Sequence, residues 1–269
     1  MPPYVVLEKP AGETPLQTLT RYREQHENLK TVPMAYAGRL DPMASGKLLI
    51  LIGDECKKQA QYHKLDKTYR FEILFGVSSD TGDIMGRLTP TSPPTLTKRQ
   101  VADAIHTLPR SITLPYPPFS AKTVAGKPLH TWTLEGRLSE ITIPTYTTTL
   151  YQIQLTTIRT IDASTAHTAV RSRIDQLPTV TEASKHIGAD FRRNDVRADW
   201  RDWLNTYHDH HFPLATITCT VTAGTYMRSL APYIASQLAT TGLAYSIHRS
   251  RIGHYQPLWG DYGWWRKTY

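Results

Sequence analysis

One aspartate stands in a turn where a charge is unexpected: Asp41, within the stretch AGRLDPMASGKLLILIG over residues 37–53. The apolar run at 48–52 predicts a buried strand, so the turn places this carboxylate at the edge of the core. Asp-Pro is a frequent turn dipeptide, and alone it indicates only a turn aspartate or a helix N-cap. In a closed pocket, however, an ionised carboxylate can act as a nucleophile or abstract a proton. Such a carboxylate needs a cation beside it to stay charged.

Two further side chains could take part in such chemistry. Tyr69 begins an alternating strand pattern over 69–75 and shares a strand face with Phe71 and Ile73. Its ring is therefore either a core aromatic or, at the end of the stripe, the wall of a pocket. Arg228 follows an Ala-Gly turn at the start of a predicted helix. There it is either a solvated arginine, as most arginines are, or a cation presented to a cleft.

Composition and charge narrow the class of partner. The chain has 269 residues, with 31 lysines and arginines against 23 acids and a net charge of +8. This balance favours a polyanionic partner, either nucleic acid or a membrane surface.

Cys56 and Cys219 lie far apart in the sequence, which is typical of buried thiols in a reducing compartment. No segment approaches the roughly 20 apolar residues of a spanning helix, and no signal peptide is recognisable, so a cytoplasmic protein is expected.

Local patterns predict how strands and helices are arranged. Thr14 is a good N-cap for a helix, and Thr97 with Gln100 forms a capping box for another. Alternating apolar residues over 145–161 predict a strand. Strands and helices interleave without strict βαβ spacing, which predicts an α+β fold with a mixed or antiparallel sheet.

The segment at about 164–213 differs from its surroundings and is predicted to be an insertion carrying one amphipathic helix. Five apolar residues fall at helical spacing: Val196, Trp200, Trp203, Leu204 and Tyr207. Arg193, Arg197 and Arg201 follow one another at i+4 and form either a solvated ridge or an RNA contact. The histidine-rich run at 208–211 lacks a spaced fourth ligand, so no metal site is predicted.

Six segments in the same order resemble the TruB family of tRNA pseudouridine synthases. They are KPAGETP, GRLDPMASGKLLILIG, DKTYRFEILFGVSSDTGD, LPYPPFSAKTVAGKPLH, CTVTAGTYMRSLAPYIASQL and HRSRIGHY, within residues 4–255. The resemblance implies the pseudouridine synthase fold, with a mixed, largely antiparallel central sheet, flanking helices and an RNA-binding cleft. It also implies isomerisation of uridine to pseudouridine, a reaction without redox change that requires no cofactor.

The resemblance further assigns roles to residues of this chain. Asp41 of the LDP motif would be the catalytic carboxylate, Arg228 of GTYxR its electrostatic partner, and Tyr69 the ring that stacks on the extruded uracil. Whether the carboxylate attacks the sugar or removes a ribose proton stays open. The residues implied for RNA binding or for ordering that site are Lys9, Tyr36, Arg39, Asp83, Lys122, Lys127 and Arg249. For Asp83 an ordinary turn carboxylate is the alternative, and Lys122 stands one residue away from the usual family lysine.

The chain also departs from the family pattern. Tyr36 stands where the family usually has a histidine, and Arg39 gives the spelling GRLD, which is similar to sister families that modify ribosomal RNA. We expect Arg39 or Tyr36 to replace the histidine. The chain ends 14 residues after Tyr255. This tail is too short for the PUA module that bacterial members carry. We therefore expect one catalytic domain over residues 1–269. Its aromatic tail, from Trp259 onward, either stacks on bases or folds over the domain, and the second is favoured.

The sequence therefore predicts a monomeric tRNA pseudouridine synthase that acts on the uridine of the T-arm loop, without membrane association. The same reaction on ribosomal RNA is one alternative, prompted by Arg39. A non-catalytic RNA-binding or tRNA-folding protein is the other. The combination of Asp41, Tyr69 and Arg228 argues against that last alternative, because binding a polyanion requires no acid.

Overall fold

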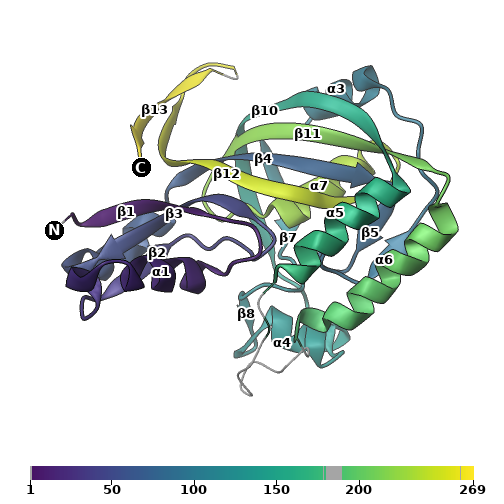
Figure 1. The fold of residues 1–269 in the computed structure, drawn as a ribbon. Helices are drawn as coiled ribbons and strands as arrows, with labels where there is room; N and C mark the ends of the chain where they lie inside the picture. The colour runs from purple at the N-terminus through teal and green to yellow at the C-terminus, as the bar shows by residue number, and fades with distance from the viewer. Residues whose placement is uncertain (1, 178, 180–189, 261) are drawn as a thin grey trace.

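The structure is a computed structural model that describes residues 2–177, 179, 190–260 and 262–269. Within these residues nine strands form one sheet (Figure 1). Seven of them lie in the order β1 (Tyr4–Lys9), β3 (Ser45–Ile52), β12 (Gly242–Pro257), β4 (Asp66–Phe75), β11 (His211–Val221), β10 (Thr145–Asp162) and β7 (Ser111–Pro115). Of the other two, β2 (Met34–Ala37) pairs with β3 and β13 (Gly263–Thr268) pairs with β12.

The sheet is mixed and mostly antiparallel. β12 runs parallel to β3 where His248 and Arg249 pair with Ser45 and Gly46. The other pairings among the described strands of this sheet are antiparallel. Two short hairpins lie outside it, β5 (Val77–Ser79) with β6 (Leu88–Pro90) and β8 (Thr123–Val124) with β9 (Lys127–Pro128). The predicted α+β fold with a mixed, largely antiparallel sheet is confirmed.

Helices cover this sheet and connect its strands. The α-helices are α1 (Pro15–Glu24), α2 (Gln59–His63), α3 (Lys98–His106), α4 (Leu129–Leu134), α5 (Ala163–Asp175), α6 (Arg193–Tyr207) and α7 (Met227–Ser236). Short 3₁₀ helices occur at η1 (Glu27–Leu29), η2 (Gly53–Lys58), η3 (Leu138–Glu140) and η5 (Asp190–Arg192). The predicted caps are confirmed, because Thr14 and Thr97 each complete a capping box at the start of α1 and α3.

The main core lies between α7 and the central strands. Phe71 and Ile73 from β4, Ile217 from β11, and Leu230 and Ile234 from α7 are all fully buried in one cluster. Burying one such side chain contributes about 1.5–3 kcal/mol, so the cluster makes a rigid platform. Loops that leave this cluster at β4 and α7 therefore have well-fixed ends.

The segment at 164–213 contains two described helices rather than the one predicted. The predicted helix is present as α6, and it buries Val196, Trp200 and Trp203. The additional helix is α5, which packs against α6 beside β10 (Figure 1). Its buried face includes two alanines, Ala163 and Ala166, which give a weak hydrophobic pattern in the sequence. This explains why periodicity alone missed it.

The aromatic tail folds partly onto the domain. The ring of Trp265 in β13 packs against Tyr255, with 5.4 Å between centroids, and Tyr269 packs against Tyr4 at 5.1 Å. In contrast, Trp259 is 90% exposed and Tyr262 is 76% exposed at the end of the hairpin. The favoured expectation, a tail that hides its rings, therefore holds only in part. Among the described residues, none of the helices has the length and hydrophobicity to cross a membrane.

Candidate active site

The loop between β2 and β3 presents Asp41 to a pocket. Its neighbours Leu40 and Met43 are buried and anchor the loop, whereas the Asp41 side chain is 42% exposed. The Asp41 carbonyl accepts a hydrogen bond from the Ala44 amide at 3.0 Å, which closes a turn around Pro42. The sequence thus makes a turn whose apolar residues point inward and whose one acid points outward.

Arg228, in the first turn of α7, is the cation beside this acid. Its Nε donates to Oδ2 of Asp41 at 2.6 Å and lies 3.7 Å from Oδ2 of Asp83. Its Nη1 and Nη2 donate to the carbonyl oxygens of Thr81, at 3.4 Å, and Phe119, at 3.2 Å. The side chain is only 6% exposed, so its position is set by these partners rather than by water. The structure therefore brings the predicted acid and its predicted partner into contact.

Asp83 lies behind this pair and is buried. Burial raises the pKa of Asp83, although the Arg228 guanidinium and a hydrogen bond from the Thr81 hydroxyl oppose that rise. Its Oδ1 also accepts from the Met85 amide at 2.8 Å, which ties the carboxylate to its own turn. Burial lowers the pKa of Arg228, but Asp41 and Asp83 outweigh burial, and the pKa lies above its usual value. Asp83 therefore helps to hold Arg228 rather than facing the pocket.

Tyr69 and Arg249 lie opposite each other on β4 and β12. Both are almost completely buried, and burial raises the pKa of the Tyr69 hydroxyl. Nε of Arg249 donates to the carbonyl of Lys47 at 2.8 Å, and its Nη atoms donate to those of Gly38, at 3.0 Å, and Arg39, at 3.3 Å. Arg249 thus ties the start of the Asp41 loop to the sheet. This burial favours a positioning role over the RNA contact that the resemblance implied.

Lys9 is also a buried side chain that supports the Asp41 loop. Its ammonium donates to the carbonyls of Pro10, at 2.9 Å, Glu13, at 2.7 Å, and Pro42, at 3.4 Å. Burial lowers the pKa of Lys9 to about 8, partly opposed by Glu13 and Asp41. A side chain with 0% exposure does not reach a partner at the surface. The expectation that Lys9 contacts RNA is therefore corrected: in this structure it anchors the residue that follows Asp41.

Lys67 is a buried lysine at the pocket that sequence reasoning did not single out. Its Nζ donates to the carbonyls of Leu65 and His63, the second at 3.4 Å. Burial and the neighbouring charge of Arg249 lower the pKa of Lys67 to about 7. The signal was present in the sequence, because residues two apart on a strand share a face, and Lys67 precedes Tyr69 by two.

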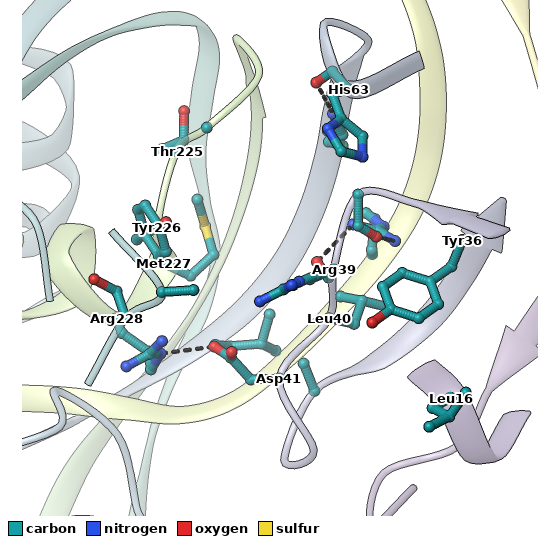
Figure 2. Close-up of a pocket in the computed structure, with 18 of the residues that line it drawn as sticks. Leu16, Tyr36, Arg39, Leu40, Asp41, His63, Thr225, Tyr226, Met227 and Arg228 are labelled. Carbon is teal, nitrogen blue, oxygen red and sulfur yellow. Dashed lines mark hydrogen bonds and ion pairs between the residues drawn. The ribbon is translucent and has the colours of Figure 1, made fainter. Parts of the chain in front are cut away.

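A pocket of about 1010 Å³ is lined by Asp41, Lys67, Tyr69, Arg228 and Arg249, among others. The predicted site residues in its lining are Tyr36, Arg39, Asp41, Tyr69, Lys122, Arg228 and Arg249. Figure 2 shows Asp41 and Arg228 facing each other, Arg39 extending from the Asp41 loop, and Tyr36 on the side of Leu16. Lys122 is exposed at the rim, with its ammonium 5.2 Å from the centroid of the Tyr116 ring.

Other cations predicted from the sequence lie outside the pocket lining, and several of them form ion pairs with acidic side chains. Lys127 binds Glu135 at 2.6 Å and lies 4.5 Å from the Trp132 ring centroid, within the β8–β9 and α4 region. The predicted basic ridge on α6 is interrupted. Arg197 is paired with Asp175, and Arg193 is buried, while Arg201 remains exposed. Among the described residues, no cluster of three or more potential metal ligands occurs, including at 208–211.

Comparisons with known proteins identify the family of this chain. The solved "Crystal Structure of a Cbf5-Nop10-Gar1 Complex" matches 93% of this chain and 48% of that chain, with a TM-score of 0.54 and 14% identity. This likeness shows a shared fold. A family model described as "TruB family pseudouridylate synthase (N terminal domain)" matches residues 26–173, more than half of the chain. The chain belongs to the TruB family.

Several similar proteins carry the name tRNA pseudouridine synthase B. The one from Caldicellulosiruptor saccharolyticus is 24% identical over 93% of this chain and 67% of its own length. The one from Aquifex aeolicus is 30% identical over 51% of this chain and 47% of its own length. The one from Idiomarina loihiensis is 28% identical over 68% of this chain and 59% of its own length. The chain thus matches about half to two thirds of the length of these relatives.

Proposed function

We propose that this protein isomerises uridine to pseudouridine in the T-arm loop of tRNA, with Asp41 as the catalytic carboxylate. The observation that carries the proposal is the 2.6 Å contact between Arg228 Nε and Asp41 Oδ2 at a pocket that Tyr69 also lines. Similar proteins named tRNA pseudouridine synthase B support the choice of tRNA. The fold and the family make the isomerisation the reaction to test first.

The reaction and the geometry of Asp41 are compatible. The bond between the ribose and N1 of uracil breaks, the base turns in the pocket, C5 joins the ribose, and the proton of C5 is replaced by one on N1. Nothing is oxidised or consumed. Because Arg228 holds one oxygen of Asp41 and the side chain is 42% exposed, the other oxygen is available to substrate. It serves either as nucleophile at the sugar or as base toward a ribose proton.

A uridine within folded RNA must leave its stack to reach Asp41. Extruding a base costs a few kcal/mol, which contacts to the RNA backbone offset. The exposed cations Arg39 and Lys122, in the lining of the pocket, are suited to phosphate contact. The Tyr69 ring provides the face on which we expect the uracil to stack.

The experiment maps pseudouridine after incubation with unmodified RNA. The substrates are a tRNA transcript, the same transcript with cytidine at the T-loop position, and a ribosomal RNA transcript, read by carbodiimide labelling and primer extension. The proposal predicts one stop, at the T-loop uridine of the first transcript. Product only on ribosomal RNA would contradict the tRNA assignment. Binding of tRNA without product on either RNA would contradict catalysis and favour an RNA-binding or tRNA-folding protein.

A further inference from the structure

Arg192 connects the segment before α6 with two loops of the candidate active site. Its Nη1 and Nη2 donate to the two carboxylate oxygens of Asp80, at 2.5 and 3.0 Å. Its guanidinium carbon lies 4.3 Å from the centroid of the Phe119 ring. One planar side chain therefore makes a bidentate ion pair and a cation–π contact at once, which a lysine cannot reproduce.

Both partners of Arg192 belong to the loops that hold Arg228. Asp80 precedes Thr81, whose carbonyl accepts from Nη1 of Arg228. Phe119 provides the carbonyl that accepts from Nη2 of Arg228. Nε of Arg228 in turn binds Asp41. The contacts thus form a continuous path from Arg192, through two separate loops, to the carboxylate in the pocket.

The same turn between β5 and β6 is attached to α6 at two further points. Nε of Arg87 donates to Oδ2 of Asp199 at 2.7 Å. The indole Nε1 of the buried Trp200 donates to the carbonyl of Ile84 at 3.0 Å. Together with Arg192, these contacts fix this turn to the segment that contains α6. The Phe119 loop is bound to the same segment through Arg192.

The backbone of Arg192 indicates that these contacts determine its position. Its φ of +54° lies in the left-handed region, which for a residue with a side chain costs about 1 kcal/mol or more. The side chain is 20% exposed and that of Asp80 is 39% exposed, so the ion pair contributes little to global stability. An effect of Arg192 is therefore expected at the site rather than on the overall fold.

We infer that Arg192 is a positioning residue for the Arg228–Asp41 pair, an inference that rests on the proposed function of that pair. It joins the two loops whose carbonyls orient the Arg228 guanidinium. Arg192 lies outside the region that the family model matches, residues 26–173. Through Arg192, the segment containing α6 thereby stabilises the position of the Asp41 carboxylate.

The test compares Arg192→Ala and Arg192→Lys with a matched control, Arg197→Ala, on the neighbouring helix. Arg197 forms an ion pair with Asp175 and contacts neither loop in any described hydrogen bond. Small misplacements of reacting groups change rates by up to about 100-fold. We expect Arg192→Ala to lower the single-turnover rate at saturating tRNA about 10-fold, with Arg192→Lys intermediate. The Kd for tRNA should stay within about twofold, and Arg197→Ala should match the wild type.

Hydrogen exchange provides a readout that is independent of turnover. In Arg192→Ala, amides at 79–87 and 116–122 should exchange faster, whereas those of the central strands should not. Phe119→Leu should lower the rate through the same path, so the double variant with Arg192→Ala should lose less than the sum of both effects.

Unchanged exchange in both loops, or a rate loss equal to that of Arg197→Ala, would overturn the inference. If the wild type makes no pseudouridine in any RNA, the proposed function fails. Hydrogen exchange of the amides at 79–87 and 116–122 would then still show whether Arg192 stabilises these two loops.

Discussion

The guanidinium of Arg228 and the carboxylate of Asp41, 187 positions apart in the sequence, meet at 2.6 Å. Arg228 lies in the first turn of a core helix and is buried, whereas Asp41 begins a turn at the pocket and is 42% exposed. The first is therefore fixed and the second accessible. The buried Asp83 shares the same guanidinium at 3.7 Å. Arg228 therefore serves two carboxylates, one that faces the pocket and one that faces the core.

Removing Arg228 should damage the fold as well as activity. Arg228→Met leaves Asp83 buried without its cation, and breaking such a pair costs about 3–5 kcal/mol. The free energy of unfolding, measured in urea, should fall by that amount. Adding Asp83→Asn should recover part of the loss, because the amide carries no charge. If the double variant were less stable than Arg228→Met alone, the shared ion pair would not explain the stability.

Gly82 should be intolerant of any side chain. Its φ is +74°, and a Cβ would lie 2.1 Å from the carbonyl oxygen of Arg228, at the start of α7. Gly136 is a matched control, with φ of +69° and no atom within 4 Å of an added Cβ. We expect Gly136→Ala to cost about 1 kcal/mol, from backbone strain alone, and Gly82→Ala to cost clearly more and to reduce the single-turnover rate. Equal losses in thermal unfolding would contradict the close approach.

Lys67 should make stability depend on pH. Its pKa is lowered by burial from 10.5 to about 7, so between these values the unfolded chain holds a proton that the folded protein lacks. The free energy of unfolding therefore rises with pH across this window and is flat below it. Lys67→Met removes this contribution, so the stability difference, wild type minus variant, should increase from pH 7 to 9. Urea unfolding at several pH values measures it.

The exposed Lys30 provides the control for this pH series. It forms a surface ion pair with Glu27, and Lys30→Met should give a stability difference that is constant over the same range. A constant difference for Lys67→Met as well would show that Lys67 keeps its proton in the folded protein, contrary to the effect expected from its burial.

Arg39 and Tyr36 stand where this sequence departs from the family pattern, and both line the pocket. We expect that one of them occupies the space beside the extruded uridine. Arg39→Ala should then weaken tRNA binding and slow turnover several-fold, and Tyr36→Ala should do so if its ring has this role. Single-turnover kinetics over a range of enzyme concentrations separates the two effects. Unchanged rate and affinity in both variants would eliminate the hypothesis.

Local sequence patterns predicted much of the fold. The Thr14 and Thr97 caps, the alternation in β4 and the apolar stripe of α6 all rest on interactions between near neighbours. Helix α5 was not predicted, because alanines on its buried face give little contrast in hydrophobicity between its two faces. The topology of the sheet depends on long-range pairing, and it became predictable only through the resemblance to a family.

Burial of charged residues at the site was the part that the sequence did not reveal. Lys9, Lys67 and Arg249 each look like a surface cation in the sequence, because lysine and arginine are usually exposed. In the structure, backbone carbonyls satisfy their donors, from residues nearby in the sequence for Lys9 and Lys67 and from Lys47 of a neighbouring strand for Arg249. Nor does any local pattern connect Arg192 with Phe119, since they meet only after the sheet and α6 have packed.

The most direct measurement is the single-turnover rate of Asp41→Asn on the unmodified tRNA transcript, beside the wild type. The amide keeps the size of the side chain but is neither a nucleophile nor a base. We expect the rate to fall at least about 10⁴-fold, with tRNA affinity and thermal unfolding close to those of the wild type. Pseudouridine formation within a few-fold of the wild-type rate would contradict the assignment of Asp41 as the catalytic carboxylate.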